Sequence, residues 1–225
     1  MKYDLLIFDA DGTLFDFATA EKRAFYQTLK IQGIETDLAD LHELYQKINH
    51  QYWIQFERGE ISAAELRSQR FKEFFATAAL QLDAEQVSRQ YLEYLAEGTD
   101  LLPGAEELLQ QLVGEARIVL ATNGLADVQY PRIAGSSLAD CFSDIFISEE
   151  LGFPKPDLRY FEAMFQKLPE FEKALIIGDN LASDILGGIN AEIDSCWYNP
   201  AQKSNTLAIT PTYEIAELAD LLDIL

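Results

Sequence analysis

Acidic side chains that follow short apolar runs are the first candidates for chemistry in this sequence. Asp9 and Asp11 come after the apolar run 5–8, and Asp179 comes after the apolar run 174–177 and one glycine. Carboxylates that converge repel one another unless a cation joins them, and Mg²⁺ prefers such oxygen ligands. We therefore expect Asp9 and Asp179 to hold a magnesium ion.

The same region could transfer a phosphoryl group, because other residues could neutralise and bind that group. Asp9 could attack phosphorus as a nucleophile, and Asp11 could protonate the leaving oxygen and later activate water. Lys155 could bring positive charge to the phosphoryl oxygens, while Thr122 and Asn123 could donate hydrogen bonds to them. Such an arrangement would break a phosphate ester through a covalent intermediate on Asp9.

Each of these motifs, taken singly, also has a purely structural explanation. Asp-x-Asp-Gly is commonly a solvated turn, Thr-Asn-Gly a loop or helix cap, and Lys-Pro a surface kink. Asp179 and Asp184 flank an expected helix start, where the helix dipole favours acidic residues. The order of the motifs and their positions after apolar runs favour the functional interpretation.

Apolar runs and helical repeats predict the elements that must position these residues. We expect strands over residues 5–8, 118–121, 145–147, 174–177 and 195–198, and helices over 103–113, 127–133, 157–168, 181–190 and 213–222. Alternating strands and helices form a parallel sheet with helices on both faces, which predicts a doubly wound, Rossmann-like α/β fold. The carboxyl ends of its strands border one crevice, where the candidate residues would meet.

Residues 16–97 interrupt this alternation with a stretch that is helical throughout. Turn signals divide the stretch into about four helices, near residue 33, at 59–62 and at 82–83. We therefore predict an α/β core formed by residues 1–15 and 98–225, with a helical domain of residues 16–97 inserted into it.

Four motifs in a fixed order make the sequence resemble the haloacid dehalogenase-like hydrolases. They are residues 9–14 (DADGTL), 122–123 (TN), 155–156 (KP) and 178–184 (GDNLASD). The resemblance spans the whole chain. It implies that the inserted helices are similar to the small cap of this family, which closes over the site, excludes water and selects the leaving group.

The resemblance also implies a role for each matching residue. The implied roles are Asp9 as nucleophile, Asp11 as general acid and base, Thr122 and Lys155 as phosphate-binding groups, Asp179 as a magnesium ligand, and Asn123 and Asp184 as supporting residues. In the family the backbone carbonyl at the Asp11 position also contacts the metal. True dehalogenases of the family lack this second aspartate, so Asp11 favours phosphate esters over carbon–halogen bonds.

A second resemblance, to bacterial pyrimidine 5′-nucleotidases that clear non-standard nucleotides, points to a substrate class. It is carried by Trp53, Phe56, residues 59–62, Leu66, residues 70–71, 147–152, 183–191 and 196–197. It implies a nucleoside monophosphate such as UMP, dUMP or dTMP as substrate, with Trp53 and Arg70 as candidates for recognition. The alternatives are a phosphatase for phosphoglycolate or a sugar phosphate, a phosphomutase, and a regulatory or phosphate-binding protein without turnover.

Several side chains of the insertion have simpler explanations than substrate recognition. A stripe at helical spacing is typical of a buried helix face rather than a base-stacking platform, and it consists of Tyr45, Ile48, Tyr52 and Phe56. For Arg70 we favour an ion pair with a carboxylate of the insertion over contact with a phosphate. His42 and His50 lack a third ligand, and we interpret both as solvated.

Composition excludes several classes of protein. The 225 residues include 17 Lys plus Arg and 38 Asp plus Glu, so the formal net charge is −21 and a nucleic-acid polymer is not an expected partner. No apolar run approaches the roughly 18 residues of a membrane span, and no signal segment is evident. Cys141 and Cys196 are interpreted as reduced thiols. We expect a cytoplasmic monomer or weak oligomer acting on a small phosphate ester.

Overall fold

A sheet of six parallel strands forms the centre of the computed structural model, which describes all 225 residues. The strands are β1 (Leu5–Phe8), β2 (Arg117–Thr122), β3 (Asp144–Ile147), β4 (Ala174–Gly178), β5 (Asp194–Tyr198) and β6 (Tyr213–Ile215), in the order β3-β2-β1-β4-β5-β6. The central strand β1 pairs with β2 on one side and β4 on the other, so the strand order reverses there. The predicted doubly wound α/β fold is confirmed.

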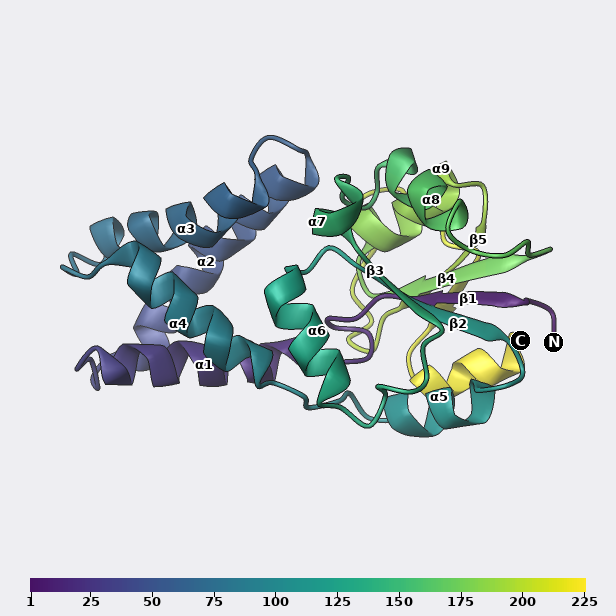
Figure 1. Cartoon of the computed structure of the whole chain (residues 1–225), viewed down its shortest axis with the longest axis horizontal. Helices are drawn as coiled ribbons and strands as arrows, with labels where there is room; N and C mark the ends of the chain where they lie inside the picture. The colour runs from purple at the N-terminus through teal and green to yellow at the C-terminus, as the bar shows by residue number, and fades with distance from the viewer.

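Helices cover both faces of this sheet (Figure 1). One face packs against α5 (Ala105–Leu112) and a C-terminal 3₁₀ helix (Leu218–Asp223). The other face packs against α8 (Leu158–Phe165). Alternate residues of β1 point to opposite faces, which is why the whole strand is an unbroken buried apolar run.

A four-helix bundle lies beyond the carboxyl ends of the strands (Figure 1). It consists of α1 (Phe17–Ile31), α2 (Leu38–Glu57), α3 (Ala63–Thr77) and α4 (Ala84–Ala96). Its helices bury an aromatic core of their own, including Tyr45, Phe71 and Tyr91. Ser62 and Glu65 form a capping box that starts α3, so the chain turns there for a local reason.

Three shorter helices follow the strands. Helix α6 (Ala126–Ala134) follows β2, and α7 (Ser148–Leu151) follows β3. Strand β4 leads into a π-helical turn (Leu181–Ile185), which continues into α9 (Leu186–Asn190). The helix predicted over 181–190 therefore begins with wider winding, a feature that often occurs at functional sites.

The helix predicted over residues 213–222 is wrong in its first part. Residues 213–215 form β6, an edge strand parallel to β5, and only the 3₁₀ helix follows. Within the 3₁₀ helix the buried apolar residues Leu218 and Leu221 are three residues apart, which matches three residues per turn. A strand of three residues is too short to show the alternation that identifies strands.

The chain ends meet on the side of the sheet away from the bundle (Figure 1). There the backbone N–H of Lys2 donates to the carbonyl of Leu225 at 2.8 Å. Both cysteines are free thiols; Cys196 is buried in the sheet, whereas Cys141 is only partly buried. Not one of the helices combines the length and apolar character needed to cross a membrane.

Candidate active site

A cavity of about 640 Å³ lies between the carboxyl ends of the strands and helix α2 of the bundle. Its sheet side contains all seven core residues predicted from the motifs: Asp9, Asp11, Thr122, Asn123, Lys155, Asp179 and Asp184. Its bundle side contains Trp53 but not Arg70. Parallel strands bring these distant parts of the sequence together because all their carboxyl ends lie at one edge of the sheet.

Asp9 follows β1, and its carboxylate contacts the buried ammonium group of Lys155. Lys155 Nζ donates to Asp9 Oδ1 at 2.8 Å, to Asp184 Oδ1 at 2.7 Å and to the carbonyl of Ala121 at 2.6 Å. These acceptors use all three protons of the ammonium group, which fixes its position. Burial by itself lowers the pKa of Lys155, but the charges of Asp184 and Asp9 outweigh it and raise the pKa. Lys155 therefore stays charged beside Asp9.

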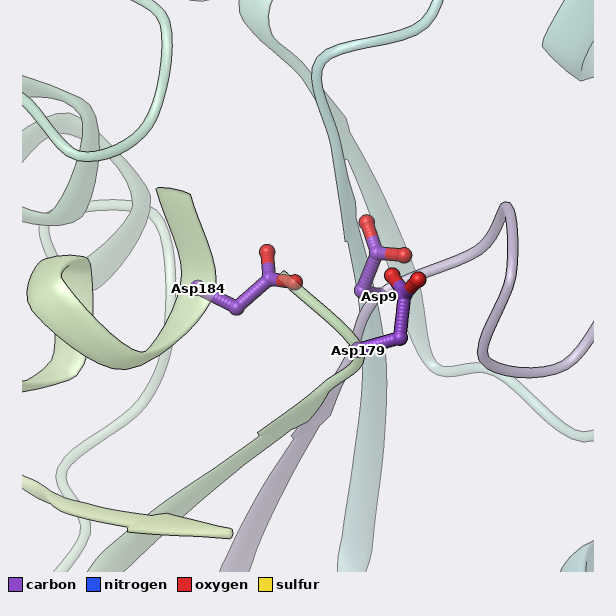
Figure 2. A group of neighbouring side chains, drawn as sticks. All are labelled: Asp9, Asp179 and Asp184. Carbon is purple, nitrogen blue, oxygen red and sulfur yellow. The ribbon is translucent and has the colours of Figure 1, made fainter. Parts of the chain in front are cut away.

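Three carboxylates converge at this point: Asp9, Asp179 and Asp184 (Figure 2). Each offers an oxygen, and the three oxygens lie within 4.8 Å of one another. Burial and the charge of Asp184 raise the pKa of Asp179 to about 7. Burial also raises the pKa of Asp9, and the charges of Asp184 and Asp179 raise it further. The positive charge of Lys155 acts in the opposite direction but does not cancel this increase.

A magnesium ion fits this group of carboxylates. Burial and mutual repulsion both disfavour the charged forms of these carboxylates, and a divalent cation would offset both effects; carboxylate oxygens are also the ligands that Mg²⁺ prefers. Asp184, predicted only as a supporting residue, contributes one of the three oxygens. The carboxylate of Asp11 does not belong to this cluster of Asp9, Asp179 and Asp184. If Asp11 contacts the metal, it does so through its backbone carbonyl.

Gly12 and Thr13 hold Asp9 and Asp179 next to each other. The Thr13 hydroxyl donates to Asp9 Oδ2 at 3.3 Å and accepts from the backbone N–H of Asp179 at 3.1 Å. Gly12 has a φ of +87°, and a Cβ atom at this position would lie 2.7 Å from Asp179 Oδ2. Only glycine satisfies both the left-handed backbone and this close approach.

The Asp11 side chain points toward helix α6. Its Oδ2 accepts from Gln129 Nε2 at 2.6 Å, and its Oδ1 pairs with Arg132 Nη1 at 2.5 Å. Arg132 is fully buried, and its Nε donates to the carbonyl of Gly98 at 2.7 Å while its guanidinium lies 5.1 Å from the centre of the Phe15 ring. Arg132 therefore links Asp11 to both segments that connect the bundle with the sheet.

The sequence interpretation missed Gln129 and Arg132. The one signal that could have found them is their position on the helix that follows the Thr122 motif, three residues apart and hence on one helix face. Nothing in the sequence says that this face is directed at Asp11, because that depends on how α6 packs against the sheet.

Thr122 and Asn123 organise the loops around Lys155. Thr122 Oγ1 accepts from the backbone N–H of Gly124 at 3.0 Å. Asn123 Oδ1 accepts from the backbone N–H of Lys155 at 2.8 Å, and Asn123 Nδ2 donates to the carbonyl of the same residue at 3.0 Å. The Lys155–Pro156 peptide bond is cis. The amide of Asn123 thus holds the backbone from which the Lys155 side chain extends.

Helix α2 presents one face to the cavity and a neighbouring face to the bundle core. The cavity face consists of Gln46, Asn49, His50, Trp53, Ile54 and Glu57. Tyr45, Ile48 and Phe56 are buried, as the stripe predicted. Tyr52 is only half-buried, and its hydroxyl donates to Glu73 Oε2 at 2.9 Å.

Two predictions for bundle side chains are wrong. Arg70 makes no ion pair: it is buried, its Nη1 donates to Asn49 Oδ1 at 2.7 Å, and its guanidinium lies 5.5 Å from the centre of the Tyr91 ring. His42 is buried rather than solvated, with Nε2 at 3.3 Å from Glu21 Oε2. Both take part in a polar network between helices, which the periodicity of one helix does not reveal.

Comparison with known proteins places these observations in a family. The family model of the haloacid dehalogenase-like hydrolases matches residues 3–192. The chain is 40% identical over 228 residues to the pyrimidine 5′-nucleotidase PynA of Streptococcus pneumoniae, covering 100% of this chain and 96% of that protein. It is 32% identical over 227 residues to the pyrimidine 5′-nucleotidase YjjG of Escherichia coli, covering 100% and 99%.

A solved structure agrees with these sequence matches. The crystal structure of YfnB from Bacillus subtilis, bound to magnesium, superposes with a TM-score of 0.91 at 37% identity. The match covers 100% of this chain and 99% of that one, so the similarity includes both the sheet and the bundle.

Proposed function

The chain belongs to the haloacid dehalogenase-like hydrolases, and from that premise we propose that it is a magnesium-dependent phosphatase for pyrimidine nucleoside 5′-monophosphates. The observation that carries the proposal is the Asp9 carboxylate on the cavity wall, held by a charged Lys155 and grouped with Asp179 and Asp184. The nucleotide specificity is supported by the similarity to PynA and YjjG, which are named as pyrimidine 5′-nucleotidases.

The residues on the sheet side have complementary roles in this reaction. An oxygen of Asp9 attacks phosphorus, and the bond from phosphorus to the leaving oxygen breaks as that oxygen takes a proton from Asp11. Asp11, now ionised, takes a proton from water, and the water oxygen attacks phosphorus and releases Asp9. Lys155 fixes Asp9, and Thr122 binds the phosphoryl oxygens.

Magnesium would be held by Asp9, Asp179 and Asp184, together with the backbone carbonyl of Asp11. When bound, it supplies positive charge that offsets the negative charge of the carboxylates and the phosphoryl group. Asn123 contributes indirectly, because its amide holds the backbone of Lys155 in place.

The four-helix bundle is proposed to act as the cap of this enzyme. In this division residues 16–97 form the cap domain, and residues 1–15 and 98–225 form the catalytic core. Trp53 lies on the cavity wall of the bundle and could contact the leaving group. Arg70 is proposed to act through Asn49, which it touches, rather than by contact with substrate.

The Asp9→Asn variant tests the mechanism. Because the amide is not a nucleophile, we expect phosphate release from UMP, dUMP and dTMP to fall by roughly 10⁴-fold or more. The control is Asp140→Asn, the same change at an exposed aspartate, which should keep full activity. Release is measured with and without Mg²⁺, and a fully active Asp9→Asn enzyme would contradict the mechanism.

The same assay separates the proposed function from its alternatives. The panel adds AMP, GMP, phosphoglycolate, glucose 6-phosphate and glycerol phosphate. Faster hydrolysis of a sugar phosphate or phosphoglycolate than of every pyrimidine nucleotide would keep the chemistry and reject the nucleotide specificity. No release from any ester would favour a regulatory or phosphate-binding protein.

A further inference from the structure

The bundle side of the cavity carries negative charge and no compensating lysine or arginine. Its wall is formed by α1 and α2 and includes Glu21, Gln46, Asn49 and Glu57. Two of these residues, Glu21 and Glu57, are acidic. Arg70 lies behind Asn49 and does not reach the cavity, and the lysines that line the cavity, Lys155 and Lys203, come from the sheet domain. The part of the substrate that points toward the bundle therefore meets an acidic wall.

Glu21 is held rigidly although its carboxylate borders the cavity. The residue is 4% exposed, and three side chains direct nitrogens at its carboxylate. Gln46 Nε2 donates to Oε2 at 3.0 Å, Asn49 Nδ2 donates to Oε1 at 3.4 Å, and His42 Nε2 lies 3.3 Å from Oε2. A proton on His42 Nε2 would complete a third hydrogen bond to this carboxylate. These contacts hold the Glu21 side chain in one orientation, so its carboxylate stays at the cavity wall when a ligand enters.

The neighbouring amide adds a second acceptor to the same wall. Gln46 uses Nε2 on Glu21, while its Oε1 has no partner in the protein. The amide of Asn49 donates to Glu21 through its nitrogen and accepts from Arg70 through its oxygen. The remaining lone pairs of the Glu21 carboxylate, together with the Gln46 oxygen, can therefore accept hydrogen bonds from donors of a ligand.

We propose that Glu21 is a specificity residue that selects phosphate monoesters with an uncharged leaving group carrying hydrogen-bond donors, and rejects esters whose leaving group is anionic. The inference rests on the proposed phosphatase function and adds the chemical class of its substrate. A second anion would be placed next to a buried carboxylate that cannot move, where repulsion is strong. An N–H or O–H group would instead form a charge-assisted hydrogen bond.

Nucleosides satisfy this requirement, because a pyrimidine base and its sugar are uncharged and carry N–H or O–H donors. Phosphoglycolate does not, since its leaving group carries a carboxylate. Glu21 thus gives a physical reason, independent of any sequence similarity, to favour nucleoside monophosphates over small acidic phosphate esters.

The test uses two phosphate esters of equal size and similar leaving-group reactivity. In 4-(hydroxymethyl)phenyl phosphate the far end of the ring is a neutral donor, and in 4-carboxyphenyl phosphate it is an anion. We expect kcat/KM of the unmodified enzyme, measured with Mg²⁺, to be at least about tenfold higher for the hydroxymethyl ester. Equal values for the two esters would overturn the proposal without any variant.

Variants then assign this discrimination to Glu21. In Glu21→Gln we expect the ratio of the two kcat/KM values to fall about tenfold. The matched control is Glu43→Gln, which removes the same charge from an exposed position on α2 and should leave the ratio unchanged. A ratio that is the same in Glu21→Gln as in the unmodified enzyme would refute the role of Glu21. If the unmodified enzyme releases phosphate neither from these two esters nor from UMP, dUMP and dTMP, the proposed function itself fails.

Discussion

At the scale of single residues, the approach of Gly12 to Asp179 can be tested with a methyl group. Gly12→Ala would place a Cβ atom 2.7 Å from Asp179 Oδ2, in addition to straining a backbone with φ of +87°. We expect Asp179 to be displaced, so that kcat/KM falls at least about tenfold and the Mg²⁺ concentration needed for half-maximal activity rises. Both quantities come from steady-state kinetics over a magnesium titration.

Gly59 provides the matched control for this substitution. It also has a left-handed backbone, with φ of +69°, but an added Cβ atom would meet nothing within 4 Å. Gly59→Ala should therefore lose about 1 to 2 kcal/mol of unfolding free energy from backbone strain alone and keep its kcat/KM. If the two variants lost activity equally, contact with Asp179 would not be the cause.

The sequence predicts those site residues that directly follow a strand, because their place in the fold depends only on the strand. Asp9 and Asp179 come after apolar strands of a parallel sheet, and the fold alone brings such residues to one edge. Arg132 escaped prediction because its contact with Asp11 depends on the packing of α6. Arg70 was misinterpreted because its partner is an amide on another helix, and no pattern within α3 reveals that.

At the scale of elements, Arg67 joins the bundle to the sheet domain. From α3 its guanidinium donates to both oxygens of Glu149 on α7, at 2.8 and 2.9 Å, and to Asp127 on α6 at 2.8 Å. The hydrogen bonds from Arg67 hold the pKa of Glu149 below its usual value, so this contact is fully present at neutral pH and is lost as Glu149 becomes protonated in acid.

Replacing Arg67 should therefore loosen the contact between the bundle and the sheet domain. Partly exposed ion pairs contribute about 0.2 to 1 kcal/mol each, so we expect KM in Arg67→Met to rise about threefold to tenfold. Small-angle X-ray scattering should show a larger radius of gyration. Arg89→Met is the control, because Arg89 lies on the adjacent helix α4 and forms no ion pair. Unchanged KM and radius in Arg67→Met would show that Arg67 does not hold the bundle in place.

Helices and strands could be predicted where an apolar pattern repeats over many residues. They could not be predicted where contacts with other parts of the chain determine the local structure. Four helices were expected within residues 16–97, and the structure has four there. By contrast, β6 has three residues and is defined by pairing with Cys196–Tyr198 of β5, not by its own sequence. The π-helical start of the segment after β4 likewise leaves no trace in the apolar pattern.

At the scale of the whole molecule, the net charge of −21 means that cations can stabilise the protein in two ways. Any cation screens the general repulsion among acidic side chains, whereas Mg²⁺ bound by Asp9, Asp179 and Asp184 would relieve a buried cluster. At about 100 times its Kd, a ligand adds roughly 2.7 kcal/mol, which for a chain of this size raises Tm by roughly 5 to 10 °C.

The Asp179→Asn variant separates these two effects in thermal unfolding experiments. Removing one of three converging carboxylates relieves repulsion, so in EDTA the variant should unfold at a higher Tm than the unmodified protein. Adding Mg²⁺ at constant ionic strength should raise Tm of the unmodified protein by several degrees and leave the variant nearly unchanged. An equal rise in both proteins would assign the stabilisation to the acidic surface as a whole and count against a magnesium site formed by these carboxylates.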